Sequence, residues 1–209
     1  MMKRIFAPYA LPLYILVRPF AGFYAMKFEN RGTVRLALFN FIMVIIAFAF
    51  NNQYVSVLAN DRHPLSLNSI VDFFFLTAAL LLFCAANWSV TSLTDGEGRF
   101  KDIIMAVCYA MTPFVLIVVP ATVLSNFLSA EEIGLYTMLM TVAFVYFIFL
   151  VFIGLITVHN YGAIKAVLTL LLTFISILII VFLLTLLFTL WQQLFSFAYS
   201  VYIELTFRG

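Results

Sequence analysis

The chain has 209 residues, of which 66% are hydrophobic, 18% aromatic and only 10% charged. A soluble domain is typically about half apolar and about a quarter charged, so the composition excludes soluble globular, disordered, coiled-coil and disulfide-rich chains. The formal net charge of +2 is too small to indicate a nucleic-acid partner, and the basic residues form no patch interleaved with aromatics. The composition therefore predicts an all-α polytopic membrane protein whose main surroundings are the lipid bilayer.

The N-terminal segment, residues 1–33, is predicted to be cytoplasmic or interfacial rather than a signal peptide. No long apolar core and no small-residue cleavage site follow its basic start. Prolines up to Pro19 argue against one continuous helix before that residue, whereas residues 20–28 can form a short helix. The many aromatic side chains beside Arg18 and Lys27 favour a position along the membrane interface.

Five apolar stretches are each long enough to cross a bilayer, whose hydrocarbon core of about 30 Å takes about 20 helical residues. They cover residues 34–58, 69–90, 103–127, 133–158 and 163–190. Alternating strands of a membrane barrel are absent from the sequence, so the predicted spans are five transmembrane helices. The fifth stretch is longer than a span requires, and residues 192–207 either extend it or lie at the interface.

The basic residues predict the orientation of these spans. Nine of the eleven Lys and Arg residues fall in the N-terminal segment or in alternate loops on the same side, and two fall on the other side. By the positive-inside rule, the N-terminus is cytoplasmic and the C-terminus extracytoplasmic. The predicted membrane domain covers residues 34–198, and residues 199–209 form a short extracytoplasmic tail.

The loop between the second and third predicted spans, residues 91–102, is the one polar cluster with charges of both signs. Its Gly-x-Gly pair lacks the strand, helix and Lys-Ser/Thr ending of a phosphate-binding loop. One hypothesis is a tight turn in which glycines supply unusual backbone angles and Asp102 favours the positive end of the next helix. The other is a docking surface for a partner. Its candidate residues, with two from the N-terminal segment, are Arg18, Pro19, Asp95, Gly96, Glu97, Gly98, Arg99, Phe100, Lys101 and Asp102.

Two spans contain polar or helix-breaking residues that are candidates for an intramembrane site. Asp72 lies about one turn into the second span, where it either faces headgroups or lies in a polar bundle interior. The Thr112-Pro113 pair and Pro120 are expected to kink or interrupt the third helix. Such breaks form binding sites in some transporters and are tolerated as packing features elsewhere. The intramembrane candidates are Asp72, Asn87, Tyr109, Thr112, Pro113 and Pro120.

A turn with three polar residues, His159, Tyr161 and Lys165, joins the fourth and fifth predicted spans. A lone His without a second His, Cys or carboxylate at ligand spacing is poor evidence for a metal site. Cys84 and Cys108 lie within apolar runs and lack metal or redox spacing. We therefore expect hydrogen-bonded turn residues, inert buried cysteines, no metal and no cofactor. The sequence offers no nucleophile–base pair or paired carboxylates, so an enzyme is not expected.

Several of these residues coincide with the pattern of a known family. They form the motifs Asn87-Trp88, Leu93-x-Asp95-Gly96-x-Gly98-x-Phe100-Lys101-Asp102, Tyr109-Ala110-x-Thr112-Pro113, His159-x-Tyr161 and Lys165. On these motifs the chain resembles the Yip family, small five-span membrane proteins named for Ypt-interacting proteins, from about Arg18 to Arg208. The resemblance implies a five-helix bundle with a cytoplasmic N-terminus.

The resemblance also bears on partners. Eukaryotic members bind prenylated Rab-type GTPases and shape or traffic vesicles. This sequence lacks their long N-terminal domain and their Asp-Leu-Tyr-Gly-Pro stretch, where residues 68–72 read Asn-Ser-Ile-Val-Asp, which argues against a GTPase partner. The compact form resembles bacterial members, some of which are associated with ABC-type transporters, and this implies a plasma-membrane location.

The leading hypothesis is a non-enzymatic accessory or scaffold subunit of a membrane complex, with an ABC-type transporter or further copies of this chain as the partner. Two other hypotheses remain open. One is a small transporter, channel or lipid-translocating protein that uses the kinked third span and Asp72. The other is a membrane-shaping scaffold that uses the aromatic N-terminal segment as an interfacial wedge.

Overall fold

The computed structural model describes residues 10–60 and 68–207, and the regular structure in these ranges is entirely helical. Five helices there are long and apolar enough to cross a membrane: α3, α4, α5 with α6, α7 and α8. The prediction of an all-α polytopic membrane protein is thus confirmed. The elements are α1 (Leu11–Val17), α2 (Pro19–Lys27), α3 (Val34–Tyr54), the 3-10 turn η2 (Val57–Ala59), α4 (Ser69–Leu93), α5 (Phe100–Ala110), α6 (Thr112–Ser125), α7 (Gly134–His159) and α8 (Ala163–Phe207).

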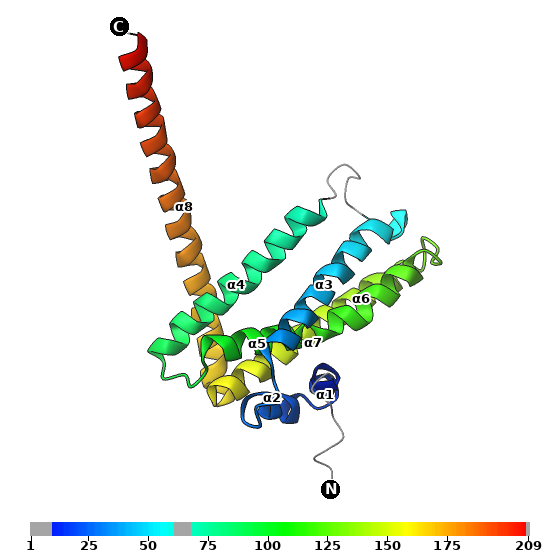
Figure 1. Cartoon of the computed structure of the whole chain (residues 1–209). Coiled ribbons are helices and arrows are strands. Elements are labelled where there is room, and N and C mark those ends of the chain that lie inside the picture. Colours follow the sequence, from blue (N-terminus) through cyan, green and yellow to red (C-terminus); the bar gives the residue numbers. More distant parts are fainter. Residues whose placement is uncertain (1–9, 61–67, 208–209) are drawn as a thin grey trace.

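The N-terminal segment forms the two short helices α1 and α2 (Figure 1). They are separated at Arg18, whose backbone leaves the helical conformation (φ −135°, ψ 77°), and Pro19 opens the second helix. Proline suits this first position because its missing N–H has no helical partner there. One face of the pair is buried against the bundle through Ile15 and Phe23. The Tyr146 hydroxyl of α7 donates a hydrogen bond to a backbone carbonyl of α1.

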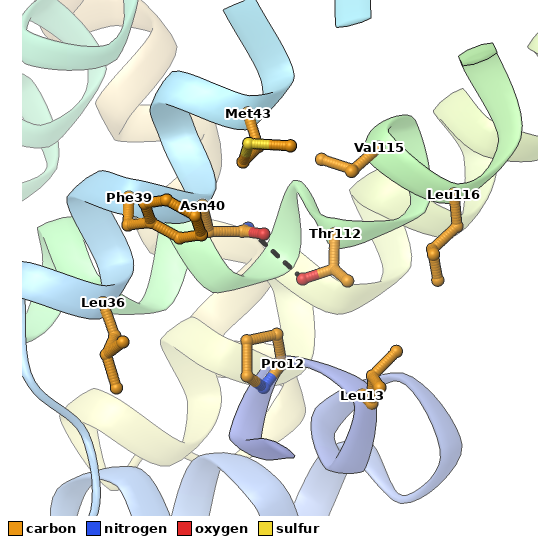
Figure 2. A pocket seen from close by; sticks show the side chains of 9 residues that line it. All are labelled: Pro12, Leu13, Leu36, Phe39, Asn40, Met43, Thr112, Val115 and Leu116. Atoms are coloured by element: carbon orange, nitrogen blue, oxygen red, sulfur yellow. Dashed lines mark hydrogen bonds between the residues drawn. The ribbon is translucent and has the colours of Figure 1, made fainter. Parts of the chain in front are cut away.

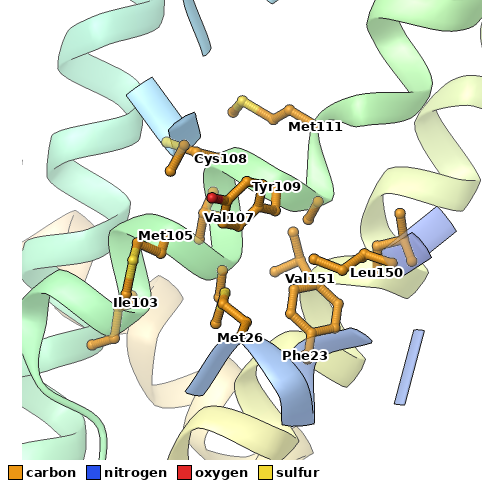
Figure 3. Packing of buried hydrophobic residues seen from close by; sticks show 14 of the residues in the cluster. Phe23, Met26, Ile103, Met105, Val107, Cys108, Tyr109, Met111, Leu150 and Val151 are labelled. Atoms are coloured by element: carbon orange, nitrogen blue, oxygen red, sulfur yellow. The ribbon is translucent and has the colours of Figure 1, made fainter. Parts of the chain in front are cut away.

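Helix α5 lies at the centre of the bundle. Eight of its eleven residues are buried, and it packs against α3, α4 and α7. Figure 3 shows Ile103 and Tyr109 of α5 in one cluster with Phe23 of α2 and Leu150 of α7. The short helix α5 therefore holds together segments from both halves of the chain.

The third span is two helices, which confirms the interruption predicted from Thr112-Pro113. Pro120, the other predicted position, lies inside α6 and does not interrupt it. Helix α5 ends at Ala110 and α6 begins at Thr112, and the ribbon changes direction between these two helices (Figure 1). Pro113 has no N–H to donate to the Tyr109 carbonyl, and the Thr112 hydroxyl donates to that oxygen instead, at 2.6 Å. The break thus keeps its backbone hydrogen-bonded without water.

Helix α8 is a single helix of 45 residues, so residues 192–207 continue the fifth apolar stretch as helix. Its buried side chains are Ala166, Thr169 and Thr173, near its start, where it packs on α4. Every residue from 181 to 207 is exposed. At a rise of 1.5 Å per residue the helix is about 68 Å long, more than twice the thickness of a hydrocarbon core. Figure 1 shows it leaving the bundle.

Candidate functional site

The basic end of the bundle, where α4 and α7 end and α5 and α8 begin, brings together two of the predicted groups. The loop between α4 and α5, residues 94–99, lies against the end of α7. The backbone N–H of Gly98 donates to Nδ1 of His159 at 3.3 Å. The Tyr161 hydroxyl lies 3.0 Å from the carbonyl oxygen and 3.0 Å from the hydroxyl oxygen of Thr94. The candidate docking loop and the turn after α7 therefore form one site, which we call the loop–turn site.

The two glycines of this loop serve close approach, which corrects the hypothesis that they supply unusual backbone angles. Neither glycine has a positive φ, and the left-handed residue of the loop is Asp95, with a φ of 55°. A Cβ atom on Gly96 would lie 2.7 Å from Nδ1 of His159, and one on Gly98 would lie 2.6 Å from Cγ1 of Val158. The loop can pack this closely on α7 only because both positions lack a side chain.

His159, at the end of α7, contacts the α4–α5 loop and α4 through its two ring nitrogens. It is only 2% exposed, and its Nε2 lies 3.3 Å from Oδ1 of Asn87 on α4. Because Nδ1 accepts the Gly98 N–H, Nε2 carries the proton and donates to Asn87. Nδ2 of Asn87 then donates to Oγ1 of Thr173 on α8, at 3.1 Å. Asn87, an intramembrane candidate in the sequence, thus belongs to the loop–turn site and couples it to α8.

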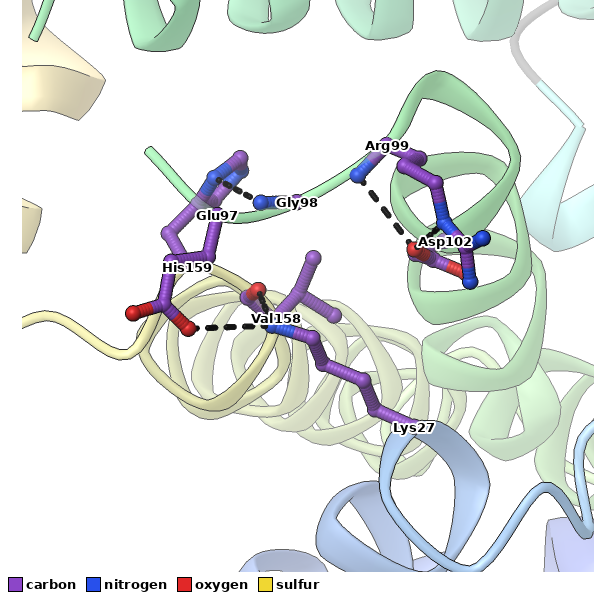
Figure 4. Close-up of polar contacts among 7 residues, drawn as sticks. All are labelled: Lys27, Glu97, Gly98, Arg99, Asp102, Val158 and His159. Carbon is purple, nitrogen blue, oxygen red and sulfur yellow. Dashed lines mark hydrogen bonds and ion pairs between the residues drawn. The ribbon is translucent and has the colours of Figure 1, made fainter. Parts of the chain in front are cut away.

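Lys27 of α2 reaches the same site, although it was not among the site residues predicted from the sequence. Its ammonium group donates to the Val158 carbonyl in the last turn of α7 and lies 3.8 Å from a carboxylate oxygen of Glu97 (Figure 4). A cation at the C-terminal carbonyls of a helix is favoured by the helix dipole. Arg18 and Pro19 lie at the other end of α2, about 12 Å along its axis, so Lys27 is the residue that meets the loop.

The start of α5 completes the loop–turn site. The Asp102 side chain is buried, and its Oδ2 accepts from the backbone N–H of Arg99 at 3.3 Å and from its Nε at 3.1 Å (Figure 4). A carboxylate at this position faces the positive end of the α5 dipole. The Phe100 ring packs edge-on against Trp88, with centroids 6.1 Å apart. The ammonium group of Lys165 lies over the ring of Tyr161, 4.4 Å from its centroid.

The outer surface of the site is charged. The side chains of Asp95, Glu97, Arg99 and Lys101 are exposed and surround the buried hydrogen bonds. The loop is thus held by His159 and Tyr161 and by the buried carboxylate of Asp102, and it presents charges of both signs outward. Such a surface can bind a polar surface of another protein.

A second polar group ties the α5–α6 break to α3. Asn40 of α3, which the sequence did not single out, donates through Nδ2 to the Cys108 carbonyl at 2.7 Å and to Oγ1 of Thr112 at 3.3 Å. The Tyr109 hydroxyl donates to the carbonyl of Thr33, just before α3, at 3.1 Å. The break is therefore fixed at two points of its neighbouring helix.

A groove of about 280 Å³ opens beside this break, between α1, α3 and α6 (Figure 2). Its two polar side chains are Asn40 and Thr112, and the others are apolar. The lining residues are Pro12, Leu13, Leu36, Phe39, Asn40, Met43, Thr112, Val115 and Leu116.

Asp72 lies at the opposite end of the bundle, away from the break. It is in the first turn of α4, and its Oδ2 accepts from Nδ2 of Asn52 on α3 at 2.7 Å. Asn52 follows Asn40 by twelve residues on α3, which is about 18 Å along the helix axis. The structure therefore does not join Asp72 and the α5–α6 break into one site.

Hydrogen bonds among uncharged groups and one carboxylate also fix the opposite end. Nδ2 of Asn51 on α3 donates to the hydroxyls of Thr122 and Tyr136, both at 2.7 Å, and so joins α3 to α6 and α7. In the loop before α7, the Ser129 backbone N–H and hydroxyl donate to Glu132 at 3.1 and 2.9 Å. These two hydrogen bonds hold the pKa of the Glu132 carboxyl below its usual range.

Within the described ranges, no three His, Cys, Asp or Glu side chains gather as the ligands of a metal ion would. Cys84 and Cys108 are both free and buried. The groups that the structure does bring together are therefore those of the loop–turn site, the α5–α6 break and the groove beside it.

Comparisons with known proteins identify the family. The family model for the Yip1 domain matches residues 13–203, a range that contains the loop–turn site, the break at Met111 and most of α8. Neither the curated proteins nor the solved structures gave a match. The match over most of the chain agrees with the motifs around Gly98, Pro113 and His159. The chain belongs to the Yip1 domain family.

Proposed function

We propose that this Yip1-domain protein is a non-enzymatic scaffold or accessory subunit that binds another protein complex within the membrane. The observation that supports this function is the length and exposure of α8. Helix α7 has 26 residues, and the same length from the start of α8 ends at residue 188. The remaining residues, 189–207, extend about 28 Å further.

This outer part of α8 is strongly apolar, and its large apolar side chains are exposed. Its exposed large side chains are Leu190, Trp191, Leu194, Phe195, Phe197, Tyr199, Val201, Tyr202, Ile203, Leu205 and Phe207. Lipid covers apolar side chains within the hydrocarbon core, but a contiguous apolar surface beyond that length marks an interaction site. A partner anchored in the same membrane would cover it with a part that projects beyond the bilayer, and the charged loop–turn surface would supply a second contact at the other end of the bundle.

The leading partner is an ABC-type transporter of a bacterial plasma membrane. The support for this class is the resemblance to compact bacterial Yip proteins. The excess of Lys and Arg, nine against two, supports an orientation in which the loop–turn site is cytoplasmic and the end of α8 is extracytoplasmic. In that orientation the charged loop would face the cytoplasmic ATPase subunits of such a transporter, and α8 would face its membrane helices.

Affinity purification from native membranes into nanodiscs, followed by mass spectrometry, tests this function. The test variant carries Leu194→Gln and Phe197→Gln on the outer part of α8. The matched control carries Phe127→Gln, a side chain that is 80% exposed in the loop after α6. We expect the wild type and the control to retain a stoichiometric membrane complex, and the α8 variant to lose it. Purification of this chain alone, or equal retention in all three proteins, would contradict the proposal.

A separate observation favours membrane shaping as a second function. The outer face of α1 and α2 carries Leu13, Val17, Phe20, Tyr24 and Phe28, all exposed. Leu13 and Val17 lie four residues apart on α1, and Phe20 and Tyr24 lie four apart on α2, so each helix exposes one apolar face that acyl chains can cover. We call these two faces together the apolar stripe. The opposite face of the same helices packs on the bundle, so the stripe is held at a fixed place relative to the spans.

Vesicle curvature measured against protein density tests this second function. We expect Val17→Gln with Phe20→Gln to abolish the curvature that the wild type produces. The matched control is Phe74→Gln with Phe75→Gln, which changes two α4 side chains about as exposed as Val17 and Phe20. We expect it to leave the curvature intact. If both double variants behave like the wild type, the stripe has no part in shaping the membrane.

A further inference from the structure

The groove beside the α5–α6 break lies at the depth of lipid headgroups and upper acyl chains. On α3 it extends from Leu36 to Met43, which is about 3 to 14 Å along the axis from Val34, the first residue of the span. Its rim includes Phe39 and Leu116, which are 60% and 43% exposed on the lipid-facing surfaces of α3 and α6. A molecule that enters the groove therefore comes from the surrounding leaflet.

The floor of the groove carries a hydrogen-bond acceptor that the protein does not use. Asn40 is only 8% exposed. Its Nδ2 faces the Cys108 carbonyl, and because a carbonyl cannot donate, this contact fixes the orientation of the amide. Oδ1 of Asn40 accepts no hydrogen bond from residues 10–60 or 68–207. Every fully buried side-chain oxygen or nitrogen in those ranges has a hydrogen-bond partner. Because Oδ1 of Asn40 has none there, it is accessible from outside the protein.

The other polar group of the groove offers no hydrogen to a ligand. The Thr112 hydroxyl donates its hydrogen to the Tyr109 carbonyl and accepts from Asn40. None of the nine lining residues is charged, so a phosphate would find no counter-charge there. The groove thus combines apolar walls, a free acceptor and no cation, which favours an uncharged amphiphile that carries a hydrogen-bond donor close to its apolar chain.

We propose that this groove binds a neutral glycerolipid with a free hydroxyl, of the diacylglycerol class. The lipid hydroxyl donates to Oδ1 of Asn40, and the upper part of one acyl chain lies along Leu36, Met43 and Leu116. A volume of about 280 Å³ is just below the usual range for small-molecule sites, about 300 to 1,000 Å³, so the groove holds only the glycerol-proximal part of the lipid. The rest of the molecule stays in the leaflet.

Photolabelling of the full chain in phosphatidylcholine nanodiscs tests this site. The probe is a diacylglycerol with a diazirine in one acyl chain, and labelled positions are mapped by mass spectrometry. We expect the label on residues 36–43 and 115–116. Excess dioleoylglycerol should compete with the label, and its 3-O-methyl ether, which cannot donate a hydrogen bond, should not. Equal competition by the two lipids would overturn the proposal whether or not any variant folds.

Two tryptophan variants supply the structural control. Leu116→Trp fills the groove without changing Asn40, and we expect it to lower labelling of residues 36–43 by at least about ten-fold, measured on protein with unchanged helical circular dichroism. Leu81→Trp on α4, where the side chain is 49% exposed, should leave labelling unchanged. Equal labelling in the two variants would count against the site. So would a diazirine label spread evenly over all lipid-facing helices, because it would indicate bulk lipid rather than a bound molecule.

Discussion

Helices α5 and α8 belong to apolar spans of similar character, yet their surroundings are opposite. In the most apolar part of the span that contains α5, 61% of the residues are buried, whereas in that of α8, which is more apolar, only 11% are buried. The more apolar helix is thus the less buried one. Hydropathy indicates that both helices enter the membrane, but it does not decide which of them packs against other helices.

Small and hydrogen-bonding side chains make that difference. The buried residues of α8 are Ala166, Thr169 and Thr173, which share one face at spacings of three and four. Helix α5 buries small residues too, among them Ala106 and Ala110. In lipid the hydrophobic effect does not drive helices together, so close approach and interhelical hydrogen bonds decide their association. The comparison predicts large effects for changes around α5 and small effects for changes along α8.

The largest effect is expected at the loop that leads into α5. Gly98→Ala places a Cβ 2.6 Å from atoms of His159 and Val158, and such overpacking costs about 2 to 3 kcal/mol of the free energy of unfolding. Unfolding in detergent micelles, followed by circular dichroism, measures it. Gly162→Ala is the matched control, because its Cβ would meet nothing within 4 Å. Equal stability of the two variants would show that the loop is not packed as described.

A smaller loss in the free energy of unfolding is expected for a change at the C-terminal end of α5. Thr112→Val removes the donor to the Tyr109 carbonyl, and an unsatisfied buried acceptor costs about 1 to 2 kcal/mol. Adding Pro113→Ala restores a backbone N–H for the same oxygen, so the double variant should regain at least half of the loss in the same unfolding measurement. A double variant that is no more stable than Thr112→Val alone would contradict this account of the break.

The hydrogen bond between α4 and α8 should contribute less to the free energy of unfolding than either of these two features. A double-mutant cycle with Asn87→Ala and Thr173→Val should give a coupling energy of about 0.6 kcal/mol, the average for hydrogen bonds between membrane helices. Thr169→Val in place of Thr173→Val is the control. Its hydroxyl donates within α8, to the Lys165 carbonyl, so its coupling to residue 87 should be near zero. A coupling above about 2 kcal/mol would make α8 an integral part of the bundle.

No effect on the bundle is expected from the outer part of α8. Deletion of residues 194–207 removes only exposed side chains, so the free energy of unfolding should change by less than about 0.5 kcal/mol. The same deletion should abolish the proposed partner complex. A clear fall in stability would mean that these residues contact the bundle, which would remove the contrast between α5 and α8.

The features that depend on local sequence could be predicted. Apolar length alone locates the five spans, and proline chemistry locates both the separation of α1 from α2 near Pro19 and the break before Pro113. The continuity of α8 has a local reason as well, because the sequence has no Pro after Pro120 and no Gly between Gly162 and Gly209. The sequence left the status of residues 192–207 open only because hydropathy does not report where a membrane surface lies.

The contacts between distant segments could not be predicted in the same way. The loop glycines are needed because His159 lies against them, and that neighbour is 61 residues from Gly98 along the chain. Lys27 and Asn40 resemble an ordinary interfacial lysine and an isolated polar residue of a span. Their roles become visible only once α7 and the α5–α6 break lie beside them.

The contact between Lys27 and Val158 also sets an order for biogenesis. Helix α2 is made early, but its partner at the end of α7 follows 131 residues later. At about 5 to 20 residues per second, α2 waits about 7 to 26 s before its binding surface emerges. During that interval α1 can already contact α5 and α6, which are made before α7. The Lys27 contact, by contrast, can form only after the fourth span has been made.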